Sequence, residues 1–261
     1  MRSLNTAATG MLAQQLNVEV ISNNIANLNT TGFKRQRAEF QDLLYQAQRR
    51  AGTAASDAGG TVPAGIQIGL GVKPTAVYRI HEQGSLLKTD NSLDIAIQGR
   101  GFFQVTLPTG ETAYTRAGSL QLNNQGSIVT ADGFAVVGPG QIPNNATGIS
   151  VNQSGQVFVQ IPGQTAAQQV GQFTMAAFIN EAGLIPIGNT NFLPSAASGD
   201  PIGGTAGTAG FGTLQQGFVE GSNVNSVNEI TSLITAQRAY EMNSKIIQAS
   251  DQMLNTVNQM R

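Results

Sequence analysis

Heptad-spaced apolar residues at both ends of the chain constrain its fold more than any other feature. They are seven residues apart: Leu4, Met11, Val18 and Ile25 near the N-terminus, and Leu233, Tyr240, Ile247 and Leu254 near the C-terminus. This spacing predicts two helices, about 37 Å and about 52 Å long, that pack lengthwise on other helices. Ser226 and Glu229 form an S-x-x-E capping box that predicts the start of the second helix. Two core helices of a single globule would show the same pattern.

The middle of the chain has a different pattern, in which short β-type runs alternate with turn sequences. From Leu93 onward the runs are LDIAIQ, FFQVTL, TAYTR, SLQL, SIVT, FAVV, ISV and QVFVQI. Among the turns are NNQG, ADG and NQSG, and Asn and Gly favour hairpin turns because they tolerate positive φ. We therefore expect a β-rich domain over roughly Lys73 to Phe218. Before it, Ala51 to Gly65 is rich in small residues and predicts a flexible or extended connection.

Together these patterns predict an α+β fold. Long N- and C-terminal helices would pair as a coiled-coil-like layer, and a central all-β domain would be built of hairpins. The expected division is an N-terminal helix in 1–32, a connecting segment in 33–72, the β-domain in 73–220 and a C-terminal helix in 221–261. The two ends of the chain would then belong to one helical domain.

Charge is scarce in this chain, which limits the partners it can bind. Only 11% of the residues are charged and the formal net charge is -1, whereas nucleic-acid binding needs a basic footprint. From Gly133 to Phe218 only Glu181 and Asp200 are ionised. An uncharged polar surface suits close packing between subunits, although a small β-domain solvated by Asn, Gln, Ser and Thr would have the same composition.

The chain carries no combination of residues that predicts catalysis, a cofactor or a metal site. It has no cysteine and a single histidine, His81, so thiolate sites are excluded and most zinc sites and triads lack their ligands. A phosphate-binding loop and a G-x-S-x-G elbow are also absent. We interpret Asp90 and Asp94 as turn residues and His81 as a hydrogen-bonded structural residue. No enzyme activity is expected.

Lys34, Arg35 and Arg37 form a small basic cluster beside two phenylalanines. Such a mixture can bind nucleic acid. Glu39 and Asp42 follow directly, however, so a salt-bridged and solvated segment is the favoured interpretation.

The N-terminal sequence lacks the features of a secretory signal. A signal peptide needs an uninterrupted apolar stretch of about 7–15 residues, and polar residues from Asn5 to Asn17 interrupt every candidate. No apolar run approaches the roughly 20 residues of a membrane-spanning helix. We expect either a cytoplasmic protein or export by a route that cleaves no signal.

Three segments of the chain carry a resemblance to a known family. They are SNNIANLNTTGFKRQR, then DIAIQGRGFFQV with YTRAGSLQLNNQGSIVTADGFAV, and finally VEGSNVNSVNEITSLITAQRAYEMNSKIIQASDQMLNTV. They resemble the signature, the shared β-domain and the terminal helix of bacterial flagellar rod and hook proteins, and together they cover most of the chain. The motif residues are Asn23, Asn24, Asn27, Gly32, Phe33, Lys34, Asn223, Asn225, Gln237, Arg238 and Tyr240.

The resemblance implies a structural subunit of the flagellar basal body. A length near 260 residues and the segment RRAGTAASDAGGTVPAGIQIGLGVKP are similar to the distal-rod branch of the family, whereas hook proteins are usually longer. Subunits would stack helically into a hollow tube that transmits torque from motor to hook, with the heptad residues as seams. The terminal helices would line the export channel, and the β-domain would face the periplasmic and outer-membrane bushing rings.

The resemblance also implies further partners and a location. The partners are the subunit itself, proximal rod proteins, the hook protein and the flagellar type III export apparatus, which removes no signal peptide. The subunit would lie in the flagellar basal body, which spans the periplasm to the outer membrane, without inserting into a membrane. A proximal rod or hook-type protein of the same family stays open as an alternative. A secreted β-rich carbohydrate-binding domain is disfavoured because Gly133 to Phe218 contains no Trp, no Tyr and two acids.

Overall fold

The computed structural model describes residues 2–49, 64–164 and 166–260. Two long helices and many strands give an α+β fold, as predicted. The chain divides into two compact units. One comprises Met1–Ile25, Gln36–Tyr78 and Ser226–Arg261, and the other comprises Ala26–Arg35 and Arg79–Asn225.

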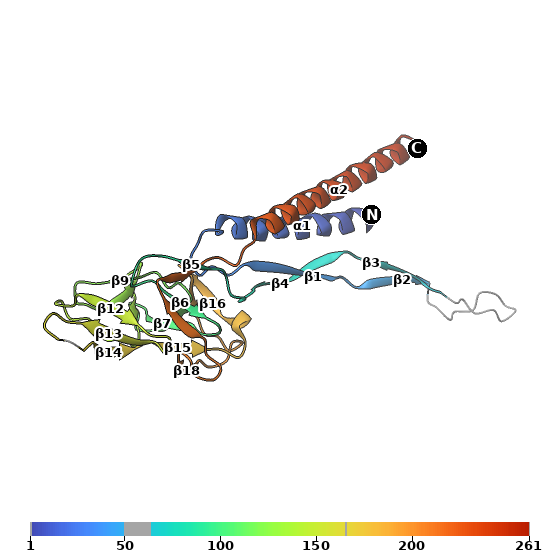
Figure 1. The fold of residues 1–261 in the computed structure, drawn as a ribbon. Helices are drawn as coiled ribbons and strands as arrows, with labels where there is room; N and C mark the ends of the chain where they lie inside the picture. The colour runs from blue at the N-terminus through green and yellow to red at the C-terminus, as the bar shows by residue number, and fades with distance from the viewer. Residues whose placement is uncertain (1, 50–63, 165, 261) are drawn as a thin grey trace. The chain divides into compact units, whose positions relative to one another are not determined.

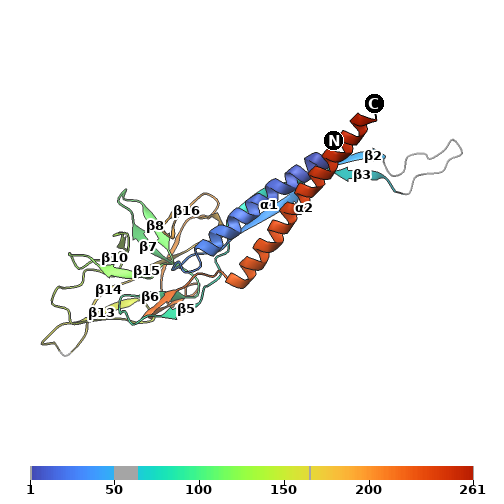
Figure 2. The ribbon, with the colours of Figure 1, turned by 90° about the horizontal axis from the view of Figure 1, so that it is seen from above.

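The first unit contains both helices, α1 (Arg2–Ala26) and α2 (Ser226–Gln259). At 1.5 Å per residue they are about 37 Å and about 51 Å long, which agrees with the lengths expected from the sequence. The helices lie side by side (Figures 1 and 2) and run antiparallel, because their contacts join the start of α1 to the end of α2. Within the described residues neither helix is long and apolar enough to cross a membrane.

Two pairs of strands complete the first unit. Strand β1 (Gln36–Asp42) pairs with β4 (Val72–Arg79), and β2 (Tyr45–Arg49) pairs antiparallel with β3 (Ile66–Gly69). Every residue of β2 is exposed. Residues 50–63, which hold most of the expected flexible connection, lie outside the described part of the chain. At the first residue of β4, the Val72 N–H donates to Thr9 Oγ1 at 3.4 Å, so β4 contacts α1.

The second unit is built from short antiparallel strands (Figure 1). In chain order they are β5 (Leu86–Lys88), β6 (Ile95–Gln98), β7 (Phe102–Thr106), β8 (Thr112–Thr115), β9 (Leu120–Leu122), β10 (Ile128–Thr130), β11 (Ala135–Val136), β12 (Gly148–Val151), β13 (Gln156–Gln160), β14 (Gln168–Gln172), β15 (Thr174–Ala177), β16 (Ile185–Gly188), β17 (Asn191–Leu193), β18 (Ile202–Thr205), β19 (Thr213–Gln216) and β20 (Phe218–Glu220). A 3₁₀ turn, η1 (Glu181–Gly183), precedes β16.

The largest sheet of this unit has nine strands. Seven follow the order β16-β17-β8-β7-β11-β10-β9, while β15 pairs with β7 and β18 pairs with β15. The remaining strands form a three-stranded sheet, β12-β13-β14, and the pairs β19–β6 and β20–β5. The pair β20–β5 places the strand that leads toward α2 beside the start of the β region.

All eight β-type runs predicted between residues 93 and 161 form strands, β6 to β13, which confirms that part of the sequence analysis. The turns between them also follow the prediction. Gly126, Gly133 and Gly155, the last residues of NNQG, ADG and NQSG, have φ of 78°, 85° and 79°. Glycine adopts this left-handed conformation without the steric penalty of a Cβ.

The second unit holds two apolar clusters. The larger one joins the inner faces of the sheets and contains fully buried residues such as Ile95, Phe103, Val157 and Met175. The smaller one is mainly aromatic and consists of Phe102, Tyr114, Ala176, Phe178, Leu184 and Phe192. Its rings meet edge to face, with Tyr114 and Phe178 centroids 4.8 Å apart. These two clusters give the β region a core of its own.

Candidate functional site

The heptad residues predicted as seams lie on the two helices, and almost all of them are partly buried. Leu4, Met11, Val18 and Ile25 of α1 and Leu233, Ile247 and Leu254 of α2 are intermediate in exposure. Tyr240 is more open, with 43% of its surface exposed. A half-buried apolar side chain can contact its own helix partner and still leave area for a second neighbour.

Small and polar residues of α1 and α2 lie in contact with one another. The Ser250 hydroxyl donates to the Ser3 hydroxyl at 3.4 Å. Gly10 approaches α2 so closely that a Cβ added there would lie 2.9 Å from Asn243 Nδ2. The helix backbones can approach at this point because residue 10 has no side chain.

Asn24 ties the end of α1 to two other segments. Its Nδ2 donates to the Gln36 carbonyl at 2.8 Å and to Glu229 Oε2 at 3.2 Å, and its Oδ1 accepts the Gln36 N–H at 2.8 Å. The side-chain amide therefore pairs with the Gln36 backbone as a neighbouring peptide group would in a sheet. Asn24 and Glu229 are both buried, and α2 begins at Ser226, close to the predicted cap.

Apolar side chains are exposed along the whole length of α2. Nine apolar residues of this helix or its last turn are each more than two-fifths exposed: Val227, Ile230, Ile234, Tyr240, Met242, Ile246, Met253, Val257 and Met260. Leu12 on α1 is also exposed, at 65%. Exposed apolar surface of this extent on one element marks an interaction surface.

In the second unit, three charged side chains meet in the interior. Lys34 Nζ donates to Glu220 Oε1 at 2.6 Å and to the Glu82 carbonyl at 2.8 Å. Arg116 Nη1 lies 3.6 Å from Glu220 Oε2, and its Nη2 donates to the Gly99 carbonyl at 2.7 Å. Burial lowers the pKa of Lys34, and the Glu220 carboxylate opposes that effect.

The sequence interpretation of Lys34 as part of a solvated basic segment is therefore wrong. Lys34 is 1% exposed, and its partner is Glu220, 186 residues away, and not the neighbouring Glu39 or Asp42. Among the three basic residues of that cluster, Lys34 alone is fully buried, because a buried carboxylate compensates its charge.

His81 packs beside this cluster between two phenylalanine rings. Its ring centroid lies 5.7 Å from that of Phe102 and 5.4 Å from that of Phe192, in edge-to-face geometry. Its buried Nδ1 has no hydrogen-bond partner, so the expectation of a hydrogen-bonded histidine fails at that atom. Burial, with the nearby cations Lys34, Arg116 and Arg79, lowers the pKa of His81 to about 3. The imidazole is neutral at pH 7.

Asn223 has a role in the second unit like that of Asn24 in the first. Its Oδ1 accepts the Arg35 N–H at 2.7 Å, and its Nδ2 donates to the carbonyls of Ile80 at 2.8 Å and Glu82 at 3.1 Å. Next to it Gly32, at φ of 70°, has the backbone of residues 116 and 117 so near that a Cβ would lie 2.7 Å from a backbone nitrogen. Two motif residues thus have local roles that a larger or apolar residue could not fill.

The other motif residues divide between interior and surface. Phe33 is buried, and Asn27 Oδ1 accepts a hydrogen bond from the Thr30 hydroxyl at 3.1 Å. Gln237 and Arg238, like Tyr240, lie exposed on α2. Asn23 and Asn225 also have interaction partners. Of the buried charged cluster, sequence reasoning singled out Lys34 alone and missed Glu220 and Arg116. In a chain with few charged residues, isolated charges are a signal of pairing.

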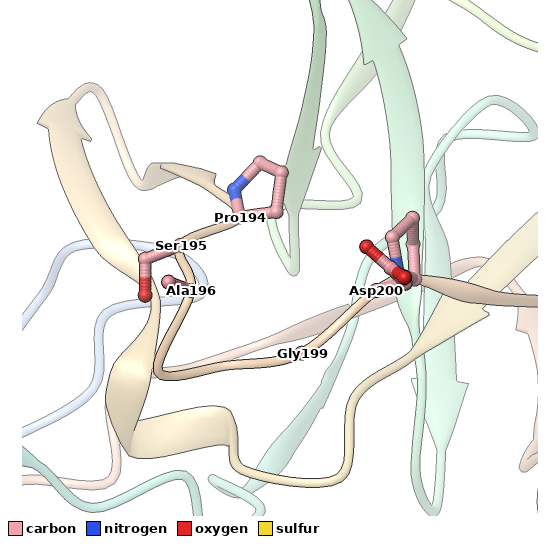
Figure 3. A pocket seen from close by; sticks show the side chains of 6 residues that line it. Pro194, Ser195, Ala196, Gly199 and Asp200 are labelled. Carbon is pink, nitrogen blue, oxygen red and sulfur yellow. The ribbon is translucent and has the colours of Figure 1, made fainter.

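The described residues offer little for chemistry. They contain no group of three or more His, Cys, Asp or Glu side chains placed to hold a metal ion. Asp94 accepts a hydrogen bond from Asn91 Nδ2 at 3.0 Å, in keeping with the turn role expected for it. An open depression of about 420 Å³ lies between the segments Pro194–Ala196 and Gly199–Pro201 (Figure 3). Asp200 is its only charged residue, so it lacks a second acid–base group.

Three protein-family models match successive parts of the chain. Residues 4–34 match the flagella basal body rod protein model, residues 96–159 match the flagellar hook protein FlgE/F/G D1 domain, and residues 215–260 match the flagellar basal body rod FlgEFG protein C-terminal model. The three matches contain most of the buried polar contacts described above, including those of Asn24, Lys34 and Glu220.

Similar proteins match the chain from end to end. The flagellar basal-body rod protein FlgG of Caulobacter vibrioides is 58% identical over 261 residues, covering 100% of both chains. FlgG of Bacillus subtilis is 39% identical and covers 97% of each chain. The flagellar hook-basal body complex protein FlhP of the same organism is 30% identical over the full length of both chains.

Proposed function

The chain belongs to the flagellar basal-body rod protein family, and on that basis we propose that it builds the distal rod by helical self-assembly. It is a structural subunit of the basal-body rod and not an enzyme. Its identity to FlgG of Bacillus subtilis exceeds its identity to FlhP of that organism, 39% against 30%. This difference supports the distal rod over other axial positions.

The exposed apolar residues of α2 are the observation that carries the proposal. Fully burying one large apolar side chain contributes about 1.5–3 kcal/mol, and nine apolar residues of α2 or its last turn are exposed. A free subunit leaves this area in water, whereas a neighbouring subunit can cover it. Close packing along a helix of this length would resist shear when the shaft transmits torque.

In this proposal the two helices form a coiled-coil-like layer that lines the export channel. The seams are the heptad residues Leu4, Met11, Val18, Ile25, Leu233, Tyr240, Ile247 and Leu254. Seven of them have intermediate exposure and Tyr240 is exposed, which supports this assignment because each retains surface that a neighbouring subunit could bury. The exposed motif residues Gln237 and Arg238 would contribute polar contacts at the same interface.

The β region, a set of hairpins, would face outward toward the periplasmic and outer-membrane bushing rings. Its lack of charge supports close packing, since only Glu181 and Asp200 are ionised between Gly133 and Phe218. We assign the helical layer to residues 1–32 and 221–261, the β-domain to 73–220 and a rod-specific connection to 33–72. The exposed pair β2–β3 supports that last role, because an isolated two-stranded ribbon is only marginally stable in water.

Partners and location follow from the same proposal. The subunit would contact proximal rod proteins at one end of the distal rod and the hook protein at the other. It would reach the periplasm through the flagellar type III export apparatus without a cleaved signal peptide and extend to the outer membrane. Neither a nucleic acid nor a lipid bilayer is a partner in this scheme.

The seam assignment is tested with charged substitutions in α2. We expect a subunit carrying Ile247→Asp and Leu254→Asp to abolish distal rods in electron micrographs of basal bodies, because burying an unpaired charge is strongly unfavourable. Gln248→Asp with Asn255→Asp, at exposed neighbouring positions, is the matched control. Circular dichroism checks that both variants remain folded before assembly. Normal rods built from the Ile247 and Leu254 variant would refute the seam assignment.

A proximal rod or hook-type role in the same family is the second candidate. The identity to FlhP over the whole chain is the observation in its favour. It differs from the distal-rod role in the stage at which assembly stops when the subunit is missing. A secreted carbohydrate-binding domain has no support from the family matches.

A further inference from the structure

Three contacts between α1 and α2, those of Ser3, Gly10 and Asn24, belong to one longitudinal register. From Ser3 to Gly10 is seven residues forward along α1, and from Ser250 to Asn243 is seven residues back along α2. The contact of Asn24 with Glu229 continues the same register fourteen residues further on. The two series, each with a seven-residue spacing, are Ser3, Gly10, Asn17 and Asn24 on α1, and Ser250, Asn243, Ala236 and Glu229 on α2.

The apolar residues alone do not select this register. Leu233, Tyr240, Ile247 and Leu254 are seven residues apart, so sliding α2 by one heptad, about 10 Å, replaces each of these residues by the next. The α1 stripe repeats in the same way. A helix pair held by these stripes alone would therefore have several registers of similar energy.

The polar contacts between the two helices differ from one another. The contact made by Asn24 also involves strand β1, through the backbone of Gln36. Asn24 uses its carbonyl and one amide hydrogen on the Gln36 backbone, so its remaining amide hydrogen points to a fixed place on α2. Glu229 occupies that place and is 7% exposed. After a slip of one heptad Asn24 would face Ala236 or the segment before α2, and the contact with Glu229 would be lost. A buried carboxylate that loses its hydrogen-bond partner is strongly destabilised.

We propose that Asn24 and Glu229 form a register lock that holds α2 against α1 in a single longitudinal position, with Gly10 and Ser3 completing the lock along the helices. A specific polar contact between two packed helices sets their register at some expense of stability. The lock also fixes the position of the exposed apolar residues of α2 along α1. Ile246, Met253 and Met260 are exposed and seven residues apart, so a slip of one heptad would move each of them about 10 Å along α1 from its present position.

Disulfide trapping in the purified subunit tests the lock, since the chain has no cysteine of its own. Ser3→Cys with Ser250→Cys reports the native register. Ser3→Cys with Asn243→Cys, and Ser3→Cys with Val257→Cys, report slips of one heptad in either direction. We expect the native pair to oxidise more than about tenfold faster than either slipped pair, which corresponds to a register preference above about 1.4 kcal/mol. Equal rates for all three pairs would overturn the proposal.

The role of the polar pair is tested by replacing it in these cysteine backgrounds. With Asn24→Leu and Glu229→Leu the slipped pairs should oxidise at rates within about threefold of the native pair. Gln15→Leu with Glu19→Leu removes an exposed hydrogen bond of 3.1 Å on α1 and should leave the preference unchanged. If the leucine pair prevents folding, Asn24→Asp should reduce the preference and Glu229→Gln should retain it, because Gln still accepts the hydrogen bond. An undiminished preference in Asn24→Asp or the leucine pair would show that the lock lies elsewhere.

The trapping uses single subunits, so its result is independent of rod assembly. A subunit with one register that builds no rod would refute the proposed function and leave the lock intact. A subunit with several registers that still builds normal rods would refute the lock and leave the proposed function intact.

Discussion

At the scale of single residues, the Glu220 carboxylate is a buried acid that meets two buried cations. Its Oε1 accepts from Lys34 Nζ at 2.6 Å and from the Gly84 N–H at 2.9 Å, and Arg116 lies 3.6 Å from its Oε2. Glu220 and Lys34 are at most 1% exposed. Removing one partner of such a pair leaves an uncompensated charge in the interior, which costs more than the pair itself contributes.

We therefore predict that Lys34→Met lowers the free energy of unfolding by about 3 kcal/mol or more. The methionine fills most of the space of the lysine but leaves Glu220 with only the more distant Arg116 as a cation. Urea unfolding of the purified subunit, followed by circular dichroism, measures the change. Lys88→Met, at an exposed position on β5, is the control and should change stability by less than about 0.5 kcal/mol. A similar small change in Lys34→Met would mean that the buried pair contributes little.

The free energy of unfolding depends on pH through His81. Its direction of change follows because the imidazole is neutral in the folded chain. Its pKa is about 3 in the folded chain, against 6.5 for an unperturbed histidine, because of burial and of Lys34, Arg116 and Arg79 nearby. Between these values the unfolded chain binds a proton that the folded chain does not. Stability from this residue is therefore complete above pH 6.5 and is lost as pH falls toward 3.

We predict that the intact subunit loses up to about 1.4 kcal/mol per pH unit through this residue between pH 6 and pH 4. His81→Gln lacks the titrating group, so its unfolding free energy should fall less steeply in that interval. Urea unfolding at several pH values gives both slopes, and carboxylates that titrate in the same range contribute to both proteins. Equal slopes for the two proteins would show that His81 is protonated in the fold.

At the scale of helices and strands, α2 has few buried side chains in the free subunit. Glu229, Ala236 and Ser250 are the buried residues along its 34 residues. Local opening is easiest where buried contacts are few, so the helix should open without unfolding of the β region. The basic residues Arg238 and Lys245 on α2 are exposed, whereas Arg116 is 4% exposed.

We predict that trypsin cuts the free subunit after Lys245 at least about tenfold faster than after Arg116, a difference of about 1.4 kcal/mol in opening free energy. Mass spectrometry of early digests measures the two rates. Incorporation into rods should protect Lys245, because the neighbouring subunits would cover α2. Equal rates in the free subunit would contradict the prediction of a loosely held helix.

The elements themselves were predictable because their signals are local. The seven-residue spacing gave both helices, and alternating runs with Asn and Gly turns gave β6 to β13. The burial of Lys34 was not predictable, since its partner Glu220 is 186 residues away and local sequence offered Glu39 and Asp42. The contact between Asn24 and Glu229 spans 205 residues, and the S-x-x-E pattern favoured a capping role for that glutamate. Patterns within one segment predict its type but not which distant side chain it meets.

At the scale of the whole molecule, the chain combines little charge with much exposed apolar surface. Only 11% of its residues are charged, and its exposed apolar residues are concentrated on α2 but also occur on β2, β3 and β16. A protein that works alone in water normally has a more charged surface. Contact with neighbouring subunits over several parts of the chain explains this composition, and full-length identity to rod proteins supports the same explanation.

The stage at which assembly stops without this subunit is therefore the most direct test at this scale. Electron microscopy of basal bodies from a strain that lacks the protein should show a short proximal rod without distal rod, outer rings or hook, because each of those parts would build on the missing subunit. Returning the intact protein from a plasmid should restore all three. A complete rod that lacks only the hook would place this subunit on the hook side of the family. Intact flagella would contradict an axial role altogether, whereas loss of the whole rod would move the subunit to the proximal end.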